Sequence, residues 1–522
     1  MLAVALLVAG AFLLRTGRQR AAAALAALIV TPALLVAELW DDPQVSHLRH
    51  HPAQLAGAIV GAAIVLLVLA ALFHRRPEAL PVLAVAALPF RLPVATTSAG
   101  GGSANLLVPL YAVIGGGVLA YAWRRLGPGS RAAAAAEGNG GGTLDEVWRE
   151  RTPGRLELAL LLFVVLYALQ SLYSSDYEQG LKNAVFFYIP FTLLLKLLTT
   201  VQWSRKIVTA CVAVTAALAL AFVGVGFVEY ATRHLLWNHK VIESNEFQSY
   251  FRVNSLFFDP NIFGRYIAMV MVVLAGLLLW ASRRRDVLVT AAMLAVLWAG
   301  LVLSFSQSSF GALLLGLGVL AGFRWGWRPV VLAGVGAAVL ALAVVVAAPG
   351  LVHLNYKSKH GVNRASSGRL DLIRGGAAMF ADRPLWGYGS GSFAKRYRAR
   401  EKASSQQAAS ASHTIPLTVA AEQGVLGFAA YVLVLVAAFG LLFAGLGRLG
   451  DRAPPARVLA RVVVAAAFCG LVLHTLLYAA FLEDPITWTL LALGIVLSAP
   501  LPSPAPLSPA PSARTRIRTS SP

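Results

Sequence analysis

The feature that most limits the fold of this chain is a long series of apolar runs separated by polar connections. Of its 522 residues, 58% are hydrophobic and only 13% are charged. A soluble protein of this length needs far more polar surface, and an apolar run of about 20 residues can cross a bilayer as a helix. The sequence therefore predicts an all-α membrane protein, a polytopic bundle of transmembrane helices.

The apolar runs also indicate the number of spans. Roughly fifteen can be counted, and we expect about 12–15 of them to cross the bilayer. They lie at 1–14, 21–39, 53–73, 79–95, 105–123, 156–172, 184–201, 207–229, 262–281, 287–303, 309–322, 329–350, 420–446, 458–480 and 486–500. The first run lacks the basic n-region of a signal peptide, so we expect it to be a span.

Basic residues alternate along the chain, occupying every second connection between these runs. They are Arg15, Arg18, Arg20, Arg75, Arg76, Arg124, Arg125, Arg205, Lys206, Arg283, Arg284, Arg285, Arg324, Arg328, Arg448, Arg452 and Arg457. The positive-inside rule places these connections, and the C-terminus, in the cytoplasm of a protein of the inner (plasma) membrane. This topology explains the net charge of +21 better than nucleic-acid binding, so the lipid bilayer is an expected partner and nucleic acid is not.

The polar segments divide the chain into six predicted parts. These are N-terminal transmembrane helices at 1–123, a Gly-rich cytoplasmic linker at 124–155, central transmembrane helices at 156–350 with an external loop at 232–261, a large extracytoplasmic loop at 351–414, C-terminal transmembrane helices at 415–500 and a disordered cytoplasmic tail at 501–522. Both long external loops are basic. Because long loops translocate largely regardless of charge, an anionic ligand would give these cations a reason.

The large loop contains its own helical signals. The segment RLDLIRGGAAMFAD predicts a short amphipathic helix on the membrane surface, capped by Ser367 and unable to continue past Pro384. Its apolar face is expected to consist of Leu370, Ile373, Ala377 and Phe380. The following segment WGYGSGSF predicts tight turns with close backbone approach, and the run KRYRAREK predicts a second, exposed basic helix.

Three arginines are candidates for binding an anion. Arg252 lies in the first external loop, Arg265 follows one turn into the next span after Asn261, and Arg369 begins the amphipathic helix. A guanidinium group holds phosphate oxygens in a bidentate fork, so their convergence would make a pyrophosphate clamp. Alternatively, Arg252 and Arg369 face lipid headgroups and Arg265 snorkels to the interface.

Several other polar residues are weaker candidates for a catalytic or binding role than the three arginines. His413 directly precedes a span and could take a proton from a hydroxyl, or it could simply be a polar residue at the start of a helix. His47, His50 and His51 do not match a recognised metal-ligand spacing, and both cysteines lie in apolar runs, so no metal site or disulfide is expected. Lys196, Arg91 and Glu422 lie within or beside spans, where charged residues are either functional or packed in structural pairs.

Four segments, in this order, resemble motifs of the O-antigen ligase and polymerase superfamily, the Wzy/WaaL-type membrane glycosyltransferases. They are FRVNSLFFDPNIFGRY, LSFSQSSFGALLLG, SGRLDLIRGGAAMFADRPLWGYGSGSF and HTIPLTVAAEQGVLGF, all within residues 249–428. Two positions depart from the family pattern, because Gln307 stands where the family often has Arg and Thr414 where it often has Asn.

The resemblance implies a GT-C-like helical fold and a metal-independent, cofactor-independent, inverting glycan transfer. The donor would be a polyprenyl-pyrophosphate-linked glycan, and the acceptor a hydroxyl of a glycan, lipid or protein. Arg252 and Arg369, with Asn261 and more weakly Arg265, would bind the donor, and His413 would position or deprotonate the acceptor hydroxyl.

Two other classes of protein remain open at this point. A transporter or flippase of lipid-linked glycans would also have basic loops, but it is expected to show related halves, and no internal repeat is evident. A structural scaffold for envelope assembly would leave the ordered motifs unexplained.

Overall fold

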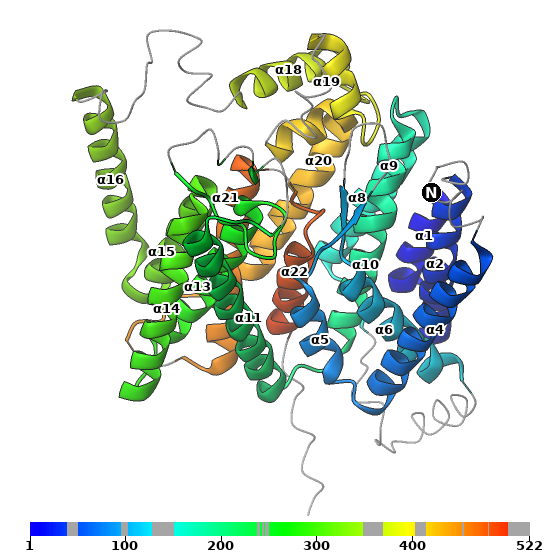
Figure 1. Cartoon of the computed structure of the whole chain (residues 1–522), viewed down its shortest axis with the longest axis horizontal. Coiled ribbons are helices and arrows are strands. Elements are labelled where there is room, and N and C mark those ends of the chain that lie inside the picture. Colours follow the sequence, from blue (N-terminus) through cyan, green and yellow to red (C-terminus); the bar gives the residue numbers. More distant parts are fainter. Residues whose placement is uncertain are drawn as a thin grey trace, which may run out of the picture.

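The computed structural model describes residues 1–38, 51–95, 103–127, 151–236, 241–242, 245, 250–347, 369–401, 414–451, 454–478 and 480–499. The described chain is a bundle of helices (Figure 1). Ten helical segments of this part are long and apolar enough to cross a membrane, and α1 and α22 are shorter apolar helices. The predicted polytopic all-α fold is confirmed.

Each predicted apolar run contains a helix. The N-terminal helices are α1 (Leu2–Leu13), α2 (Gly17–Glu38), α4 (Pro52–Arg75), α5 (Ala79–Ala87) and α6 (Val108–Leu126). The central helices are α8 (Arg155–Gln170), α9 (Tyr177–Asn183), α10 (Ile189–Thr200), α11 (Arg205–Thr232), α13 (Pro260–Leu279), α14 (Arg284–Ser304), α15 (Gln307–Trp325) and α16 (Trp327–Ala347). A 3-10 turn (Ser171–Tyr173) follows α8, and a π-helical turn (Ala184–Tyr188) joins α9 to α10. The last helices are α18 (Arg369–Asp382), α19 (Phe393–Glu401), α20 (Ile415–Phe443), α21 (Ala456–Leu477) and α22 (Pro485–Ser498).

The run 79–95 was expected to be one span, and this prediction is wrong in its second half. Helix α5 ends at Ala87, and strand β1 (Leu92–Ala95) then pairs antiparallel with β2 (Ser103–Leu106). Pro89 and Pro93 explain the change. Proline has no backbone N–H to donate and its ring clashes with the preceding turn, so an apolar composition alone cannot keep this segment helical.

Glycines let the central helices approach closely. A methyl group at Gly316 of α15 would lie 2.5 Å from Val272 of α13, and one at Gly470 of α21 would lie 2.6 Å from the carbonyl of Ala312 in α15. Such contacts through small residues are the usual basis of helix packing in membranes. They hold α13, α15 and α21 together as the frame of the site described below.

Helices α18 and α19 form a cap over the upper part of α20 (Figure 1). The existence of both helices was predicted correctly. The structure adds which face of α18 packs against the protein: Leu372 and Met379 are buried, whereas Ile373, on the predicted membrane-facing side, is 40% exposed. Gly375 and Gly376 lie against Tyr397 and Leu417, where a larger side chain would not fit.

Candidate active site at the polar end of the bundle

Polar residues gather where several spans end together. The C-terminal ends of α11, α14 and α21 and the N-terminal ends of α13 and α15 meet at one end of the bundle. The α18–α19 cap lies toward the same end (Figure 1). The described parts of the two long loops therefore share one end of the bundle, as the alternation of basic connections predicts.

Arg252 is half-buried at this end and is held on both sides. Its Nε donates to the carbonyl of Ser304, 3.1 Å away, and its Nη2 donates to Oδ1 of Asn261 at 3.4 Å. The side chain of Asn245 brackets the Arg252 backbone, accepting from its N–H at 3.1 Å and donating to its carbonyl at 3.0 Å. The structure thus brings together two of the predicted donor-binding residues, Arg252 and Asn261.

A buried carboxylate fixes the backbone that follows Arg252. Glu229, near the end of α11, accepts from the N–H groups of Ser255 at 2.7 Å, Asn254 at 3.2 Å and Leu236 at 3.3 Å. Its side chain is only 2% exposed. Because buried backbone donors must be satisfied, this carboxylate helps to fix the course of the loop that presents Arg252.

Arg265 lies one turn beyond Asn261 but has a different environment. Its guanidinium is 1% exposed and forms an ion pair of 2.5 Å with Asp484, whose side chain is 2% exposed. The other carboxylate oxygen of Asp484 caps α22 by accepting from the N–H of Ile486 at 2.9 Å. Arg265 therefore does not snorkel to the membrane interface.

Arg91 belongs to the same electrostatic environment. It lies between α5 and β1 and is half-buried. Burial lowers the pKa of Arg91, the charge of Asp484 opposes this shift, and the charge of Arg265 adds to it. The segment that breaks the predicted span at 79–95 thus brings a third arginine close to the Arg265–Asp484 pair.

A cluster of serines and a histidine lies beside Asn261 and was not predicted from the sequence. Ser306 donates to Oδ1 of Asn261 at 3.0 Å and lies 2.7 Å from Oγ of Ser309. Ser308 Oγ is 3.2 Å from Nε2 of His474, which is completely buried in α21. A histidine within an apolar span is itself a signal of function. Gln307, in the same motif, is exposed and does not enter the cluster.

The Gly-rich segment binds to a break in α20, which confirms the predicted close backbone approach. Gly424 has φ +65° and ψ −162°, so the helix is interrupted there. Across the break, Gly389 N–H donates to the carbonyl of Glu422 at 2.8 Å and Val425 N–H to that of Pro384 at 2.7 Å. The Glu422 carboxylate accepts from the N–H groups of Gly391 and Phe393, both at 2.9 Å, and so caps α19.

Replacing Gly424 by alanine is expected to detach this cap. A Cβ there would lie 2.4 Å from the carbonyl of Leu385 and would require a positive φ, so α20 and the turn cannot keep their contact. Limited proteolysis of the purified protein would detect the change as faster cleavage within 383–401. The control is Gly440→Ala in the same helix, where no atom lies within 4 Å of the added methyl group; equal protection of both variants would contradict the prediction.

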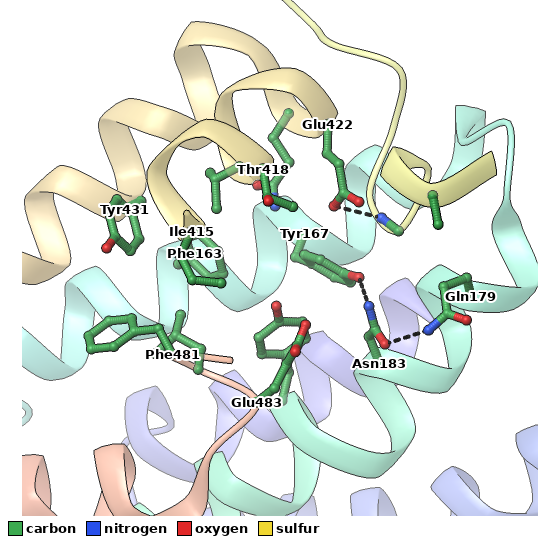
Figure 2. Close-up of a pocket in the computed structure, with 16 residues that line it drawn as sticks. Phe163, Tyr167, Gln179, Asn183, Ile415, Thr418, Glu422, Tyr431, Phe481 and Glu483 are labelled. Atoms are coloured by element: carbon green, nitrogen blue, oxygen red, sulfur yellow. Dashed lines mark hydrogen bonds between the residues drawn. The ribbon is translucent and has the colours of Figure 1, made fainter. Parts of the chain in front are cut away.

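A cavity of about 160 Å³ lies beneath the cap (Figure 2). Helices α8, α9, α19 and α20 and the chain before α22 contribute its lining, which includes the carboxylates of Glu422 and Glu483. Along one wall, Gln179 donates to Asn183 at 2.9 Å, and Asn183 donates to the hydroxyl of Tyr167 at 3.1 Å. Burial raises the pKa of Glu483, and the positive charge of Arg91 opposes this shift.

Two predicted site residues are not tested by this geometry. Arg369 begins α18, but its side chain lies outside the described structure, and His413 lies outside the described residues, as do Ser367, His47 and His50. The next residue, Thr414, donates to the carbonyl of Leu476 at 2.8 Å, which fixes the start of α20 beside the end of α21.

The remaining expectations concern a metal-binding group, in which three His, Cys, Asp or Glu side chains lie together, and a disulfide between the two cysteines. Among the described residues, no group of three His, Cys, Asp or Glu side chains could hold a metal ion. Cys211 and Cys469 are not joined in a disulfide.

The chain was compared with known protein families and curated sequences. No curated protein sequence matches the chain significantly. Residues 291–432 match the family model described as O-antigen ligase. The matched segment extends from α14 to α20 and so includes the serine cluster, the α18–α19 cap and the break at Gly424. This match supports the resemblance to the O-antigen ligase and polymerase superfamily: residues 291–432 of this membrane protein are similar to the O-antigen ligase family.

Proposed function

We propose that this protein transfers a glycan from a polyprenyl-pyrophosphate donor to an acceptor hydroxyl. The observation that carries the proposal is the setting of Arg252. Its guanidinium is anchored by Asn261 and Ser304 at the polar end of the bundle, the end toward which the α18–α19 cap lies. An arginine held in this way presents a preorganised fork to phosphate oxygens, and an anion bound there needs no rearrangement of the site.

The proposed reaction is a direct displacement. The acceptor oxygen bonds to the anomeric carbon of the donor sugar while the bond from that carbon to the phosphate oxygen breaks. The pyrophosphate leaves with the electron pair, the acceptor proton passes to His413, and the anomeric configuration inverts. Arg252 and Arg369 neutralise the charge that develops on the leaving group. Arg265 is a weaker contributor, since Asp484 already neutralises it.

The orientation that suits this reaction follows from the charges at the two ends. At the opposite end from Arg252, Arg324 donates to the carbonyl of Gly450 and pairs with Asp451 at 3.2 Å, near the other basic connections. The positive-inside rule assigns that end to the cytoplasm. The proposed site then faces the outer side of the inner membrane, on the same side as the large loop 351–414, and the C-terminus is cytoplasmic.

Arg252→Ala is expected to reduce glycan transfer by about 10²–10³-fold, the usual cost of removing one preorganised stabilising group. Arg252→Lys should restore only part of the activity, because an ammonium group lacks the planar fork. The measurement is transfer by the full-length protein, reconstituted in liposomes with a lipid-linked oligosaccharide and an acceptor glycan.

The control for this experiment is Arg374→Ala on α18, whose side chain is 58% exposed and only loosely paired with Asp371 at 3.9 Å. Equal activity of the Arg252 and Arg374 variants would remove Arg252 from the mechanism. Movement of the donor across the bilayer without any lengthening or relocation of the glycan would instead identify a flippase.

A further inference from the structure

We propose that the cavity beneath the α18–α19 cap binds one uncharged sugar unit of the acceptor. This inference rests on the proposed function, but it assigns a site separate from Arg252 and Asn261 and with a different chemistry. Three properties of the cavity carry it: the polar atoms of its lining, their charge, and its position between the start of α20 and the chain before α22.

The lining offers hydrogen-bonding atoms that the protein itself does not fully use. The hydroxyl of Tyr431 and Oε1 of Gln423 are buried and have no hydrogen-bond partner among the described residues, although both side chains are only 1% exposed. A buried polar atom without a partner costs free energy unless a ligand or water satisfies it. The cavity is also many times larger than the roughly 10–15 Å³ that one water molecule requires.

The charge of the cavity excludes the donor anion. Glu422 and Glu483 both line it, and no lysine or arginine does so among the described residues. Two carboxylates repel a pyrophosphate, whereas they are good acceptors for the hydroxyl groups of a neutral sugar. The rings of Phe163, Tyr188 and Phe481 provide the apolar wall that a sugar ring needs on its less polar face.

The position of the cavity suits an acceptor. Ile415 and Thr418 line it from the first turn of α20, immediately after His413. On the other side, Glu483 lines the cavity while its neighbour Asp484 pairs with Arg265, one turn from Asn261. A sugar in the cavity would therefore lie between the first turn of α20 and the chain that carries the Asp484–Arg265 pair.

Blocking the cavity tests the binding directly. Ala394 of α19 lines the cavity, so Ala394→Phe should fill it, whereas Ala399 on the same helix is exposed and Ala399→Phe is the matched control. The probes are the methyl pyranosides of glucose, galactose, mannose and N-acetylglucosamine, observed by saturation-transfer NMR with the full-length protein in detergent micelles. We expect at least one probe to receive saturation from the native protein and the Ala399 variant but not from the Ala394 variant.

A signal that survives in Ala394→Phe, or the absence of any signal for all four probes with the native protein, would overturn the proposal. Tyr431→Phe guards against misfolding, because it removes only the unpartnered hydroxyl and should weaken the signal without lowering thermal stability. An undiminished signal from this variant would also count against the assignment of Tyr431.

A kinetic measurement connects the cavity to transfer. Glu483→Gln is expected to raise the KM for the acceptor by about tenfold, as the loss of a hydrogen bond to a charged group implies, while the KM for the donor stays unchanged. An equal rise in both constants would refute a separate acceptor subsite. If the native protein binds the probes but transfers no glycan, the proposed function fails and the sugar site stands. If it transfers glycan but Ala394→Phe changes neither binding nor transfer, the sugar site fails and the proposed function stands.

Discussion

Asp484→Ala is expected to lower the free energy of unfolding by about 3–5 kcal/mol, the typical cost of leaving one partner of a buried ion pair uncompensated. The variant strands the Arg265 guanidinium, of which only 1% is exposed. It also removes the cap on the N–H of Ile486 at the start of α22, a loss that adds about 0.5–2 kcal/mol in other helices. Thermal unfolding of the purified protein in detergent measures the change.

Two further variants make this measurement decisive. Asp451→Ala breaks the pair with Arg324 at the other end of the bundle, where the Asp451 side chain is 87% exposed, and little loss of stability is expected. The double variant Arg265→Met with Asp484→Leu removes both charges and should recover much of the loss, because an apolar pair of similar volume avoids the cost of desolvation. If Asp484→Ala is no more destabilising than Asp451→Ala, the buried ion pair does not stabilise the fold as expected.

His413→Ala is expected to abolish most glycan transfer, by about 10²–10⁴-fold, while protein level and membrane insertion stay normal. General-base catalysis contributes a factor of this size when a side chain accepts the proton of the attacking hydroxyl. Thr414, the next residue, donates to the carbonyl of Leu476, two residues after His474. Transfer by reconstituted protein, with separate determination of kcat and KM for the acceptor, measures the effect.

The matched control for His413 is His234→Ala. His234 is exposed in the chain that follows α11, so the substitution removes an imidazole from the other long loop without touching the proposed acceptor site. Near-normal transfer by His413→Ala would take the histidine out of the mechanism. A similar loss in both variants would indicate that the effect is not specific to His413.

The helices themselves could be predicted because the bilayer imposes a local rule. Every backbone polar group within lipid must be satisfied inside its own segment, so a long apolar run is sufficient to specify a span. Helix α18 could also be predicted, from its amphipathic pattern, and it ends at Asp382, two residues before Pro384. The misjudged run 79–95 shows the limit of composition, since two prolines end the helix within it.

The closeness of Arg252 and Asn261 could be predicted from a short motif, because Asn261 lies in the first turn of the helix that follows the Arg252 loop. The pairing of Arg265 with Asp484, and of Ser308 with His474, could not be predicted in the same way. These partners belong to helices far apart in the sequence, and each reads alone as an isolated polar residue near a membrane boundary.

The sequence by itself determined that this protein spans a membrane, where most of its helices lie, and which glycines and arginines bear the resemblance to a ligase. Only the tertiary structure decided which face of α18 turns inward, that α20 breaks at Gly424, and that an acidic cavity lies beneath the α18–α19 cap. The reason is that helix formation in lipid depends on neighbouring residues, whereas a polar site within the bundle is created by helix ends that meet only after packing.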